Sequence, residues 1–286
     1  MKVRVGIGLG GADMGPDELC GVVDDMTEVG FDSLWLPEIL SRPSYDPLLA
    51  LAWAGAHNRK LKLGTTMLLP GRNLYRLAKQ LATLDVMTNG RFLVTFVPGI
   101  AQGPEREAVG VPVKERGAAI ESGLPTVRRL VAGEDVDGFV LSPLPVQREF
   151  SMWLGGMHRS SLDRCGRLAD GWLPSLCSPE DAAVGRKVID DAAASVGRTV
   201  DPEHFGVSIG YSREPLDVDS PALVSLRARN PNYADLLPVG LPAVRDLIMR
   251  YIDVGFSKFV LRPVGTPASW RAELESLASA VNDLQT

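Results

Sequence analysis

Residues 15–37 read GPDELCGVVDDMTEVGFDSLWLP, and residues 240–262, about 225 positions further on, read GLPAVRDLIMRYIDVGFSKFVLR. Each stretch opens with Gly and has Pro in the first turn of a predicted helix, as helix starts prefer. Apolar residues then recur at helical spacing, and each helix ends at Val-Gly-Phe, where Gly suits a left-handed C-cap. A short apolar strand follows in both. One helix–strand unit used early and again at the end predicts a closed α/β barrel.

The whole chain divides into eight strand–helix pairs of this kind. The predicted strands are rich in Val, Leu and Phe with little alternation, which is typical of parallel strands buried on both faces. They cover residues 3–9, 34–37, 61–69, 91–97, 152–154, 171–174, 205–211 and 258–262. The first predicted helix starts at about residue 16. The other seven cover 47–57, 72–88, 115–131, 160–169, 179–196, 241–254 and 268–284. We therefore expect a (β/α)8 TIM barrel that forms a single domain over residues 1–286.

Two features of this pattern concern particular elements. Pro125 lies inside the predicted helix 115–131 and is expected to break or kink it. Asp85 and Arg91 flank the Asn89-Gly90 turn at the N-terminal end of the barrel, where a structural ion pair is expected. The longer segments, 98–114, 133–151 and 212–239, are candidates for loops that carry chemistry.

Composition and charge exclude several classes of protein. The chain has 286 residues, is 45% hydrophobic and carries a net charge of −5. There is no basic cluster, which argues against nucleic acid or an anionic membrane as a partner. No run approaches the roughly 18 apolar residues of a membrane span, and the N-terminus enters a strand without a signal peptide. We expect a cytoplasmic protein, a homodimer, that acts on a small molecule.

Cysteines and histidines give no sign of a disulfide framework or a metal site. Cys20, Cys165 and Cys177 are an odd and scattered set, which fits a reducing compartment. Cys177 follows strand six and is placed to face the barrel mouth, but it lacks a His or Asn partner at a recognisable spacing. The three histidines, His57, His158 and His204, are far apart, so no metal is expected.

The sharpest chemical signal is MWLGGMHRSS at residues 152–161, followed by a helix and then ADGW at 169–172. A strand here ends in two glycines and delivers the chain to a helix N-terminus. Glycines let the backbone approach an anion closely, and the free N–H groups and dipole of the helix favour a phosphate. Arg159 and the hydroxyls of Ser160 and Ser161 complete such a cradle. The alternative is a tight turn without a ligand, but the place at the end of a central barrel strand favours an anion site.

A second glycine motif has a different interpretation. GIGLGG at residues 6–11 satisfies G-x-G-x-x-G, and Glu38 ends the second strand, as in a dinucleotide-binding fold. However, the helix begins only at Gly15-Pro16, so the third glycine falls in a loop. We therefore favour the interpretation that these glycines keep the mouth of the barrel open for a ligand.

Several blocks of the chain resemble one family in the same order. LGTT at 63–66, LAKQLATLD at 77–85 and NGRF at 89–92 resemble the core signature of the luciferase-like flavin and deazaflavin oxidoreductases. FDSLW at 31–35 and WLGG at 153–156 with ADGW resemble further blocks, so that the resemblance spans nearly the whole chain. The pattern is most similar to an actinobacterial subgroup that is thought to use coenzyme F420, a 5-deazaflavin. The resemblance implies a barrel that holds the ring at its C-terminal mouth and the phosphate on the Gly-Gly loop, with FMN as the alternative cofactor.

The resemblance assigns cofactor contacts to residues at strand ends and on the Gly-Gly loop: Glu38, Thr65, Thr66, Pro98, Gly99, Gly155, Gly156, Met157, His158, Arg159 and Ser160. Relatives often bulge at the strand-three position through a non-proline cis peptide, so an irregularity is expected near Thr65–Met67. For His158, cofactor contact and plain surface exposure both remain open. The polyanionic tail of F420 needs cations nearby, and Arg159, Arg164, Arg186 and Lys187 are candidates, with a solvated helix face as the alternative for the last three.

Two departures from the family restrict the function. Sugar-phosphate and alcohol dehydrogenases of the family carry a His after the acidic residue of strand two and a Glu after the glycine of strand four. Here these positions are Ile39 and Ile100, so those substrates are not carried over. With Trp35 and Trp172, these residues predict an apolar mouth, and core packing is the alternative for both tryptophans, slightly preferred for Trp35.

The functional prediction is an oxidoreductase that transfers hydride between F420 and a small, mainly apolar organic substrate. Glu38 is the predicted catalytic proton donor, since it is the only carboxylate at a strand end near the ring. An FMN-dependent monooxygenase, which would consume oxygen, is the first alternative. A barrel that binds a flavin-like ligand without turnover is the second, because Ile39 and Ile100 replace acid–base residues.

Overall fold

The computed structural model describes residues 1–10, 14–217, 219–230 and 232–286. Its sheet has eight strands that lie in the order β6-β5-β4-β3-β2-β1-β8-β7. The strands are β1 (Arg4–Gly8), β2 (Ser33–Pro37), β3 (Lys62–Leu68), β4 (Phe92–Val97), β5 (Met152–Leu154), β6 (Gly171–Trp172), β7 (Gly206–Tyr211) and β8 (Lys258–Pro263). All pairs are parallel. Trp172 N donates to His204 O at 2.9 Å and Ser208 N to Pro174 O at 2.9 Å, which joins β6 to β7 and confirms the predicted barrel.

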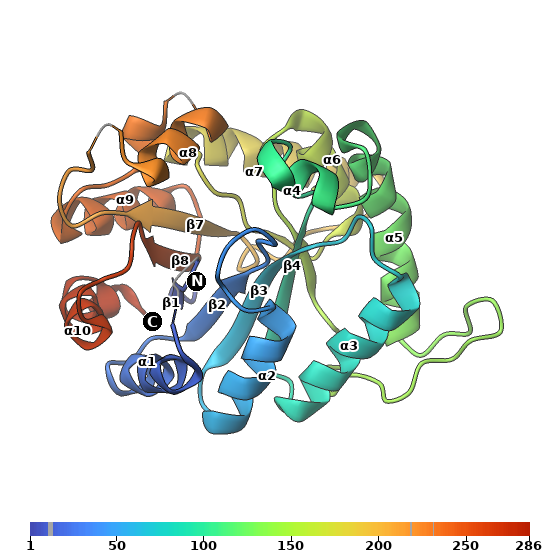
Figure 1. The fold of residues 1–286 in the computed structure, drawn as a ribbon. Helices are drawn as coiled ribbons and strands as arrows, with labels where there is room; N and C mark the ends of the chain where they lie inside the picture. The colour runs from blue at the N-terminus through green and yellow to red at the C-terminus, as the bar shows by residue number, and fades with distance from the viewer. Residues whose placement is uncertain (11–13, 218, 231) are drawn as a thin grey trace.

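Helices cover the outside of the sheet (Figure 1). They are α1 (Pro16–Glu28), α2 (Pro47–His57), α3 (Leu74–Met87), α5 (Arg116–Val131), α6 (Arg159–Leu168), α7 (Pro179–Ser195), α9 (Leu241–Asp253) and α10 (Trp270–Val281). The repeated sequence unit is confirmed, because α1 and α9 both have Pro in their first turn and lead into β2 and β8. Each buries four apolar residues on one face: Leu19, Val22, Val23 and Met26, and Val244, Leu247, Ile248 and Tyr251.

Of the two effects expected at Pro125, the break is wrong and the kink stays a prediction. Helix α5 runs without interruption from Arg116 to Val131 with Pro125 inside it. The buried stripe of the helix includes Ile120, Leu124, Val127 and Leu130, all at most 2% exposed. Burial of this stripe outweighs the hydrogen bond that a proline removes.

Two of the longer segments carry extra helices at the C-terminal end of the barrel. Residues 98–114 include α4 (Gly103–Ala108), which a short 3-10 turn (Val113–Glu115) joins to α5. Residues 212–239 include α8 (Pro221–Arg229) and a 3-10 turn (Tyr233–Leu236). A third such turn, Asn282–Leu284, follows α10.

The third long segment, 133–151, lies elsewhere. It precedes β5 and therefore reaches the N-terminal end of the barrel, where it projects from the body of the molecule (Figure 1). Asp85, which is fully buried, fastens it by accepting hydrogen bonds from Val146 N at 2.7 Å and Gln147 N at 3.1 Å. The expected Asp85–Arg91 ion pair is wrong, because Arg91 Nε donates to Thr88 O at 2.8 Å instead. Both side chains bind main-chain groups, so neither needs the other.

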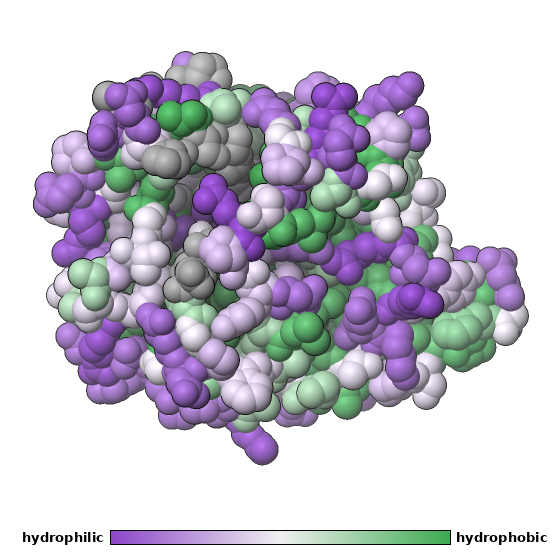
Figure 2. All heavy atoms as spheres, viewed as in Figure 1, coloured by the Kyte–Doolittle hydropathy of each residue, from purple (hydrophilic) through white to green (hydrophobic). Residues whose placement is uncertain are grey.

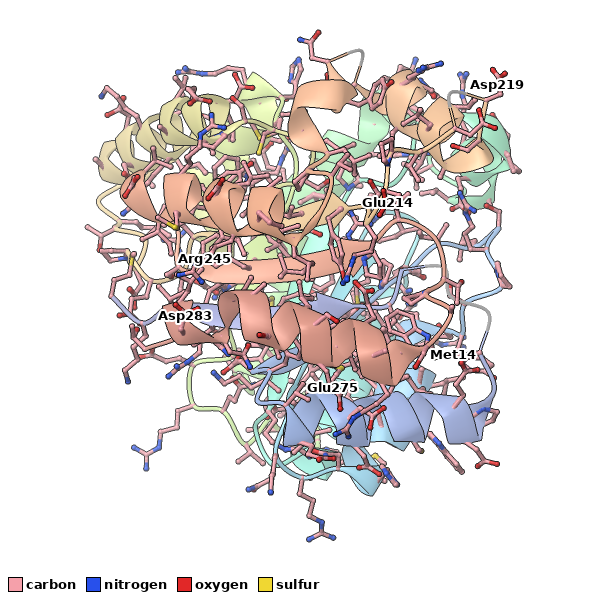
Figure 3. The ribbon with its side chains drawn as sticks, turned by 90° about the vertical axis from the view of Figure 1, so that its left-hand side faces the viewer. Met14, Glu214, Asp219, Arg245, Glu275 and Asp283 are labelled. Carbon is pink, nitrogen blue, oxygen red and sulfur yellow. The ribbon has the colours of Figure 1, made fainter. Side chains whose placement is uncertain are left out.

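Ion pairs join the last helices to the rest of the ring. Figure 3 shows Arg245 of α9 close to Asp283, and the two form a bidentate pair with distances of 2.6 and 2.7 Å. Arg271 of α10 pairs with Glu28 of α1 at 2.6 Å, which joins the end of the barrel to its beginning. Among the described residues, no helix combines the length and the apolar composition that crossing a membrane would require.

Candidate active site

A cavity of about 520 Å³ opens at the C-terminal ends of the strands. Its size is in the range of small-molecule sites, and its place is the one that barrel enzymes use for catalysis. Strands β1 to β5 and the loops after them contribute Gly8, Trp35, Pro37, Glu38, Ile39, Thr66, Leu68, Val97, Pro98, Gly99, Ile100, Ala101, Gln102, Glu105, Gly155, Gly156 and Met157. The other side is formed by Leu173, Ser175, Leu176, Ser208, Ala228, Asn230, Val260 and Arg262.

The Gly-Gly loop forms one wall of this cavity. Gly156 has φ +104°, a conformation that side chains disfavour, and a Cβ there would lie 3.2 Å from Ser161 Cβ. A Cβ on Gly155 would lie 2.8 Å from Val97 Cγ1, so β4 requires a glycine there as well. At Gly155 and Gly156 the loop is therefore a close turn that brings the backbone itself to the cavity.

The main chain after Gly156 leaves donors for an anion. His158 is the N-cap of α6, and its Nδ1 accepts from Ser160 N at 3.3 Å. Ser161 N and Leu162 N both donate to His158 O, at 2.8 and 3.0 Å. Among the described residues, none accepts a hydrogen bond from the N–H groups of 156–159. Unpaired amides at a helix N-terminus are able to bind a phosphate, and the phosphate role of this loop stays a prediction. His158, Arg159 and Ser160 are exposed beside it.

Strand β3 is regular, and the expected irregularity near Thr65–Met67 is wrong. Its residues pair in unbroken register with β2 on one side and β4 on the other. Within the described ranges, the only cis peptide bond is Ser142–Pro143. Thr66 lines the cavity as predicted, but Thr65 does not. Thr65 is fully buried and its Oγ1 donates to Leu36 O at 2.8 Å, because alternate residues of a strand face opposite sides.

Glu38 lies at the cavity edge, as the resemblance implied, but both its oxygens are occupied. Arg72 Nη2 forms an ion pair with Oε1, and Leu68 N donates to Oε2 at 2.8 Å. The Glu38 side chain is 8% exposed. A guanidinium and a main-chain amide together engage both oxygens in charge-assisted hydrogen bonds. These contacts favour a structural role and do not support Glu38 as the proton donor.

The loop after β4 is held by a buried arginine that sequence analysis missed. Arg116 is 1% exposed, and its Nη1 donates to Pro98 O at 3.3 Å and to Ile100 O at 2.9 Å. Its Nη2 donates to Arg106 O at 2.6 Å, so the same guanidinium also fixes the end of α4. Gly99 has φ +86°, and a Cβ there would lie 2.8 Å from Leu68 Cδ2. The sequence did contain a signal for this role, because Arg116 lies on the same side of the predicted helix 115–131 as the apolar Ile120 and Leu124.

The cavity is mainly apolar, as predicted. Trp35, Ile39 and Ile100 line it, and the charged lining residues within the described chain are Glu38, Glu105 and Arg262. The two tryptophans lie in the opposite places to those preferred from the sequence, which were the core for Trp35 and the mouth for Trp172. Trp35 reaches the cavity, whereas Trp172 is fully buried and packs near Phe256 with ring centroids 5.8 Å apart.

The candidate cations for a cofactor tail are mostly committed elsewhere. Arg164 is 9% exposed and lies 3.7 Å from Glu121. Arg186 lies 4.4 Å over the Phe205 ring and donates to Gly255 O at the other end of the barrel. Lys187 pairs with Asp191 at 3.0 Å on an exposed helix face. Arg159 is the candidate that stands exposed beside the Gly-Gly loop.

The thiols and polar clusters give no second site. Cys177 is 5% exposed, and burial raises the pKa of its thiol to about 12, so it is protonated and unreactive at neutral pH. In the part of the chain that the structure describes, no group of His, Cys, Asp and Glu side chains is arranged to hold a metal ion.

The fold and the site together define a class of protein, a parallel (β/α)8 barrel with an apolar cavity at its mouth and a Gly-Gly loop beside that cavity. The chain belongs to the luciferase-like monooxygenase family, whose sequence profile matches residues 2–215.

Relatives within this family differ in cofactor. The chain is 26% identical to a putative coenzyme F420-dependent oxidoreductase of Mycobacterium tuberculosis, over 72% of this chain and 65% of the relative. It thus spans just under two thirds of that protein. It is 24% identical to an F420-dependent glucose-6-phosphate dehydrogenase of Microbacterium testaceum, over 93% of each. An FMNH2-dependent dimethylsulfone monooxygenase of Pseudomonas fluorescens is 29% identical over 47% of this chain and 38% of its own.

Solved structures show the same fold. A monooxygenase from Streptomyces bottropensis has a TM-score of 0.77 at 20% identity, covering 98% of this chain and 99% of that one. The coenzyme F420-dependent tetrahydromethanopterin reductase of Methanopyrus kandleri has a TM-score of 0.76 at 17% identity, with both chains fully covered.

Proposed function

We propose that this protein is a coenzyme F420-dependent oxidoreductase that transfers hydride between the deazaflavin and a small, mainly apolar organic substrate. The observation that carries the proposal is the juxtaposition of two features. A loop with unpaired main-chain amides, 156–159, opens directly onto an apolar cavity of about 520 Å³. A phosphate-bearing ring cofactor matches this pair of features better than either a phosphate or an apolar ligand alone.

In this proposal the chain binds and orients the cofactor, which supplies the hydride chemistry. The amides of 156–159 and the hydroxyl of Ser160 would hold the phosphate. Thr66, Pro98, Gly99 and Met157 would border the ring, since all four line the cavity. Trp35 and the two isoleucines would exclude water from the reacting atoms, which strengthens electrostatic interactions there.

The choice of F420 over FMN rests on the names of the relatives and on one residue. Two relatives that align over 72% and 93% of this chain are described as F420-dependent, the first as a putative oxidoreductase. Arg159 is exposed next to the loop, where the polyanionic tail of F420 would leave the cavity. An FMN-dependent monooxygenase is the second candidate, because the dimethylsulfone monooxygenase aligns with half of the chain.

Fluorescence titration with F420 and with FMN tests the proposal. We expect F420 to bind at least about tenfold more tightly, a difference of about 1.4 kcal/mol. Equal or tighter binding of FMN, together with oxygen consumption by the reduced complex, would transfer the assignment to the monooxygenase. Binding of a cofactor without turnover of its reduced form, for any of a panel of carbonyl and alkene compounds, would support the non-catalytic barrel.

A further inference from the structure

Glu105 is a buried carboxylate in the wall of the cavity. It lies on α4 in the segment after β4, is 6% exposed, and lines the cavity. Its Oε1 accepts a hydrogen bond of 2.5 Å from Ser41 N, in the loop after β2. Within the described part of the chain, Oε2 accepts no hydrogen bond and no cation lies within ion-pair distance of either oxygen.

The second oxygen of Glu105 is open to a ligand. A carboxyl oxygen without a partner in the chain can accept a hydrogen bond from a molecule in the cavity. The nearby guanidinium of Arg116 does not pair with it, because its nitrogens bind the main-chain oxygens of Pro98, Ile100, Arg106 and Val111. Glu105 thus faces the cavity with one oxygen that no group of the described chain binds.

Glu38, the other carboxylate in the described lining of the cavity, has no free oxygen. Both its oxygens bind partners of the chain itself, and one partner is the cation Arg72. Of the two carboxylates that the described residues contribute to the cavity, Glu105 is therefore the one with an oxygen available for a substrate atom. We infer that Glu105 is the catalytic carboxylate that exchanges a proton with the oxygen of a carbonyl-bearing apolar substrate. This inference rests on the proposed function.

The loop around Glu105 is built to hold the side chain in place. The amide of Ser41 fixes one oxygen, and Arg116 fixes the main chain on both sides of α4 through Ile100 O and Val111 O. Preorganisation of this kind is what a group needs for efficient proton transfer. Glu105 thus provides a carboxylate from helix α4, whereas the chain has the apolar Ile100 at the end of β4.

The reaction balances with this single group. The carbonyl carbon accepts a hydride from the reduced cofactor, and the carbonyl oxygen accepts the proton of Glu105, so that C=O becomes CH–OH. The substrate is reduced by two electrons that leave the cofactor, and the carboxylate regains its proton from water. In the reverse direction, the carboxylate accepts the proton of an alcohol.

The test compares Glu105→Gln with two matched variants. Glu38→Gln removes the other cavity carboxylate, and Glu107→Gln removes a carboxylate of the same helix whose side chain is 87% exposed. The full-length protein is labelled with carboxyl-13C glutamate, and its NMR spectrum is recorded with and without F420. Cyclohexanol, an apolar ring with one hydroxyl, serves as the cavity probe.

We expect the resonance that is absent from Glu105→Gln to shift when cyclohexanol is added, and the resonances assigned by Glu38→Gln and Glu107→Gln to stay in place. With F420 loaded and cyclohexanone as the carbonyl probe, Glu105→Gln should reduce single-turnover hydride transfer about a hundredfold or more, with F420 affinity changed less than about threefold. An unmoved Glu105 resonance, or movement of the Glu38 resonance instead, overturns the inference. Failure of the wild type to bind F420 overturns the proposed function, while the spectra without cofactor still decide the role of Glu105.

Discussion

The indole Nε1 of Trp172 donates a hydrogen bond of 3.0 Å to the carbonyl oxygen of Gly156. Trp172 is fully buried on β6, and Gly156 is the residue at which the chain turns toward the helix that follows β5. The bond orients the peptide that follows Gly156, whose N–H group is one of the unpaired amides proposed to bind the phosphate. Two sequence blocks that are separate in the chain, WLGG and ADGW, are thereby joined into one structural unit.

This bond predicts the effect of Trp172→Phe. The variant leaves a buried carbonyl without its donor, which costs about 1–3 kcal/mol of unfolding free energy, and it loosens the loop that binds the phosphate. We expect a lower midpoint in urea denaturation and weaker cofactor binding by fluorescence titration. Trp53→Phe is the matched control, since Trp53 is 55% exposed on α2. Equal effects of the two variants would contradict the role of the bond.

Gly156→Asp tests the phosphate cradle directly. The substitution adds a negative charge and a Cβ at φ +104°, 3.2 Å from Ser161 Cβ. We expect cofactor affinity to fall by about tenfold or more. Gly197→Asp provides a control for backbone strain, because Gly197 has φ +72° but no heavy atom within 4 Å of the position that a Cβ would take. Unchanged affinity in Gly156→Asp would remove the phosphate from this loop.

The ion pair of Glu38 with Arg72 is expected to stabilise the mouth. Glu38→Gln leaves the half-buried guanidinium without its counter-charge, so that we expect a loss of about 1–3 kcal/mol of unfolding free energy. Glu134→Gln breaks the exposed pair with Arg129 and should cost less than about 1 kcal/mol. Chemical denaturation of both variants measures the difference. Equal stabilities would mean that the Glu38 pair contributes no more than a surface pair.

Burial of thiols predicts both reactivity and alkaline stability. Cys165 and Cys177 are buried and Cys20 is half-buried, so a thiol reagent at pH 8 should modify Cys20 alone until the protein unfolds. Burial raises the pKa of Cys177 from 9.0 to about 12. The unfolded thiol loses its proton first as pH rises, so this contribution to stability is present below pH 9 and disappears between about 9 and 12. In Cys177→Ala the alkaline loss of stability should be smaller, as measured by denaturation at several pH values.

A homodimer remains a prediction, and one exposed surface suggests where to test it. Leu49 and Trp53 lie one turn apart on α2 and are 74% and 55% exposed. Hydrophobic residues also gather on the projecting segment 133–151 (Figure 2). Light scattering after size exclusion should show a dimer that Trp53→Glu dissociates and that Val184→Glu, on exposed α7, leaves intact. A wild type that is monomeric at all concentrations would contradict the prediction.

Local pattern was sufficient for the elements and for part of the site. The strand at 152–154 and the start of the helix at 241 were predicted to the residue, because apolar periodicity, Pro at a helix start and Gly at its end act over a few positions. The Gly155-Gly156 turn was found for the same reason, since two adjacent glycines before a helix are themselves the structural feature. The break expected at Pro125 was overruled by burial along the helix, and the irregularity expected near Thr65–Met67 by the unbroken pairing of β3 with both its neighbours.

What the tertiary structure decided is which side chains converge. Asp85 binds a loop 61 residues away in the sequence. Trp35 lines the cavity, whereas Trp172 is buried in the core. Glu38 forms an ion pair with Arg72. Glu105 could not be found in the sequence, because nothing within its own segment shows that the amide of Ser41 and the cavity would enclose it. Backbone conformation follows from neighbouring residues, whereas the protonation and the free hydrogen-bonding capacity of a side chain depend on groups that only folding brings near it.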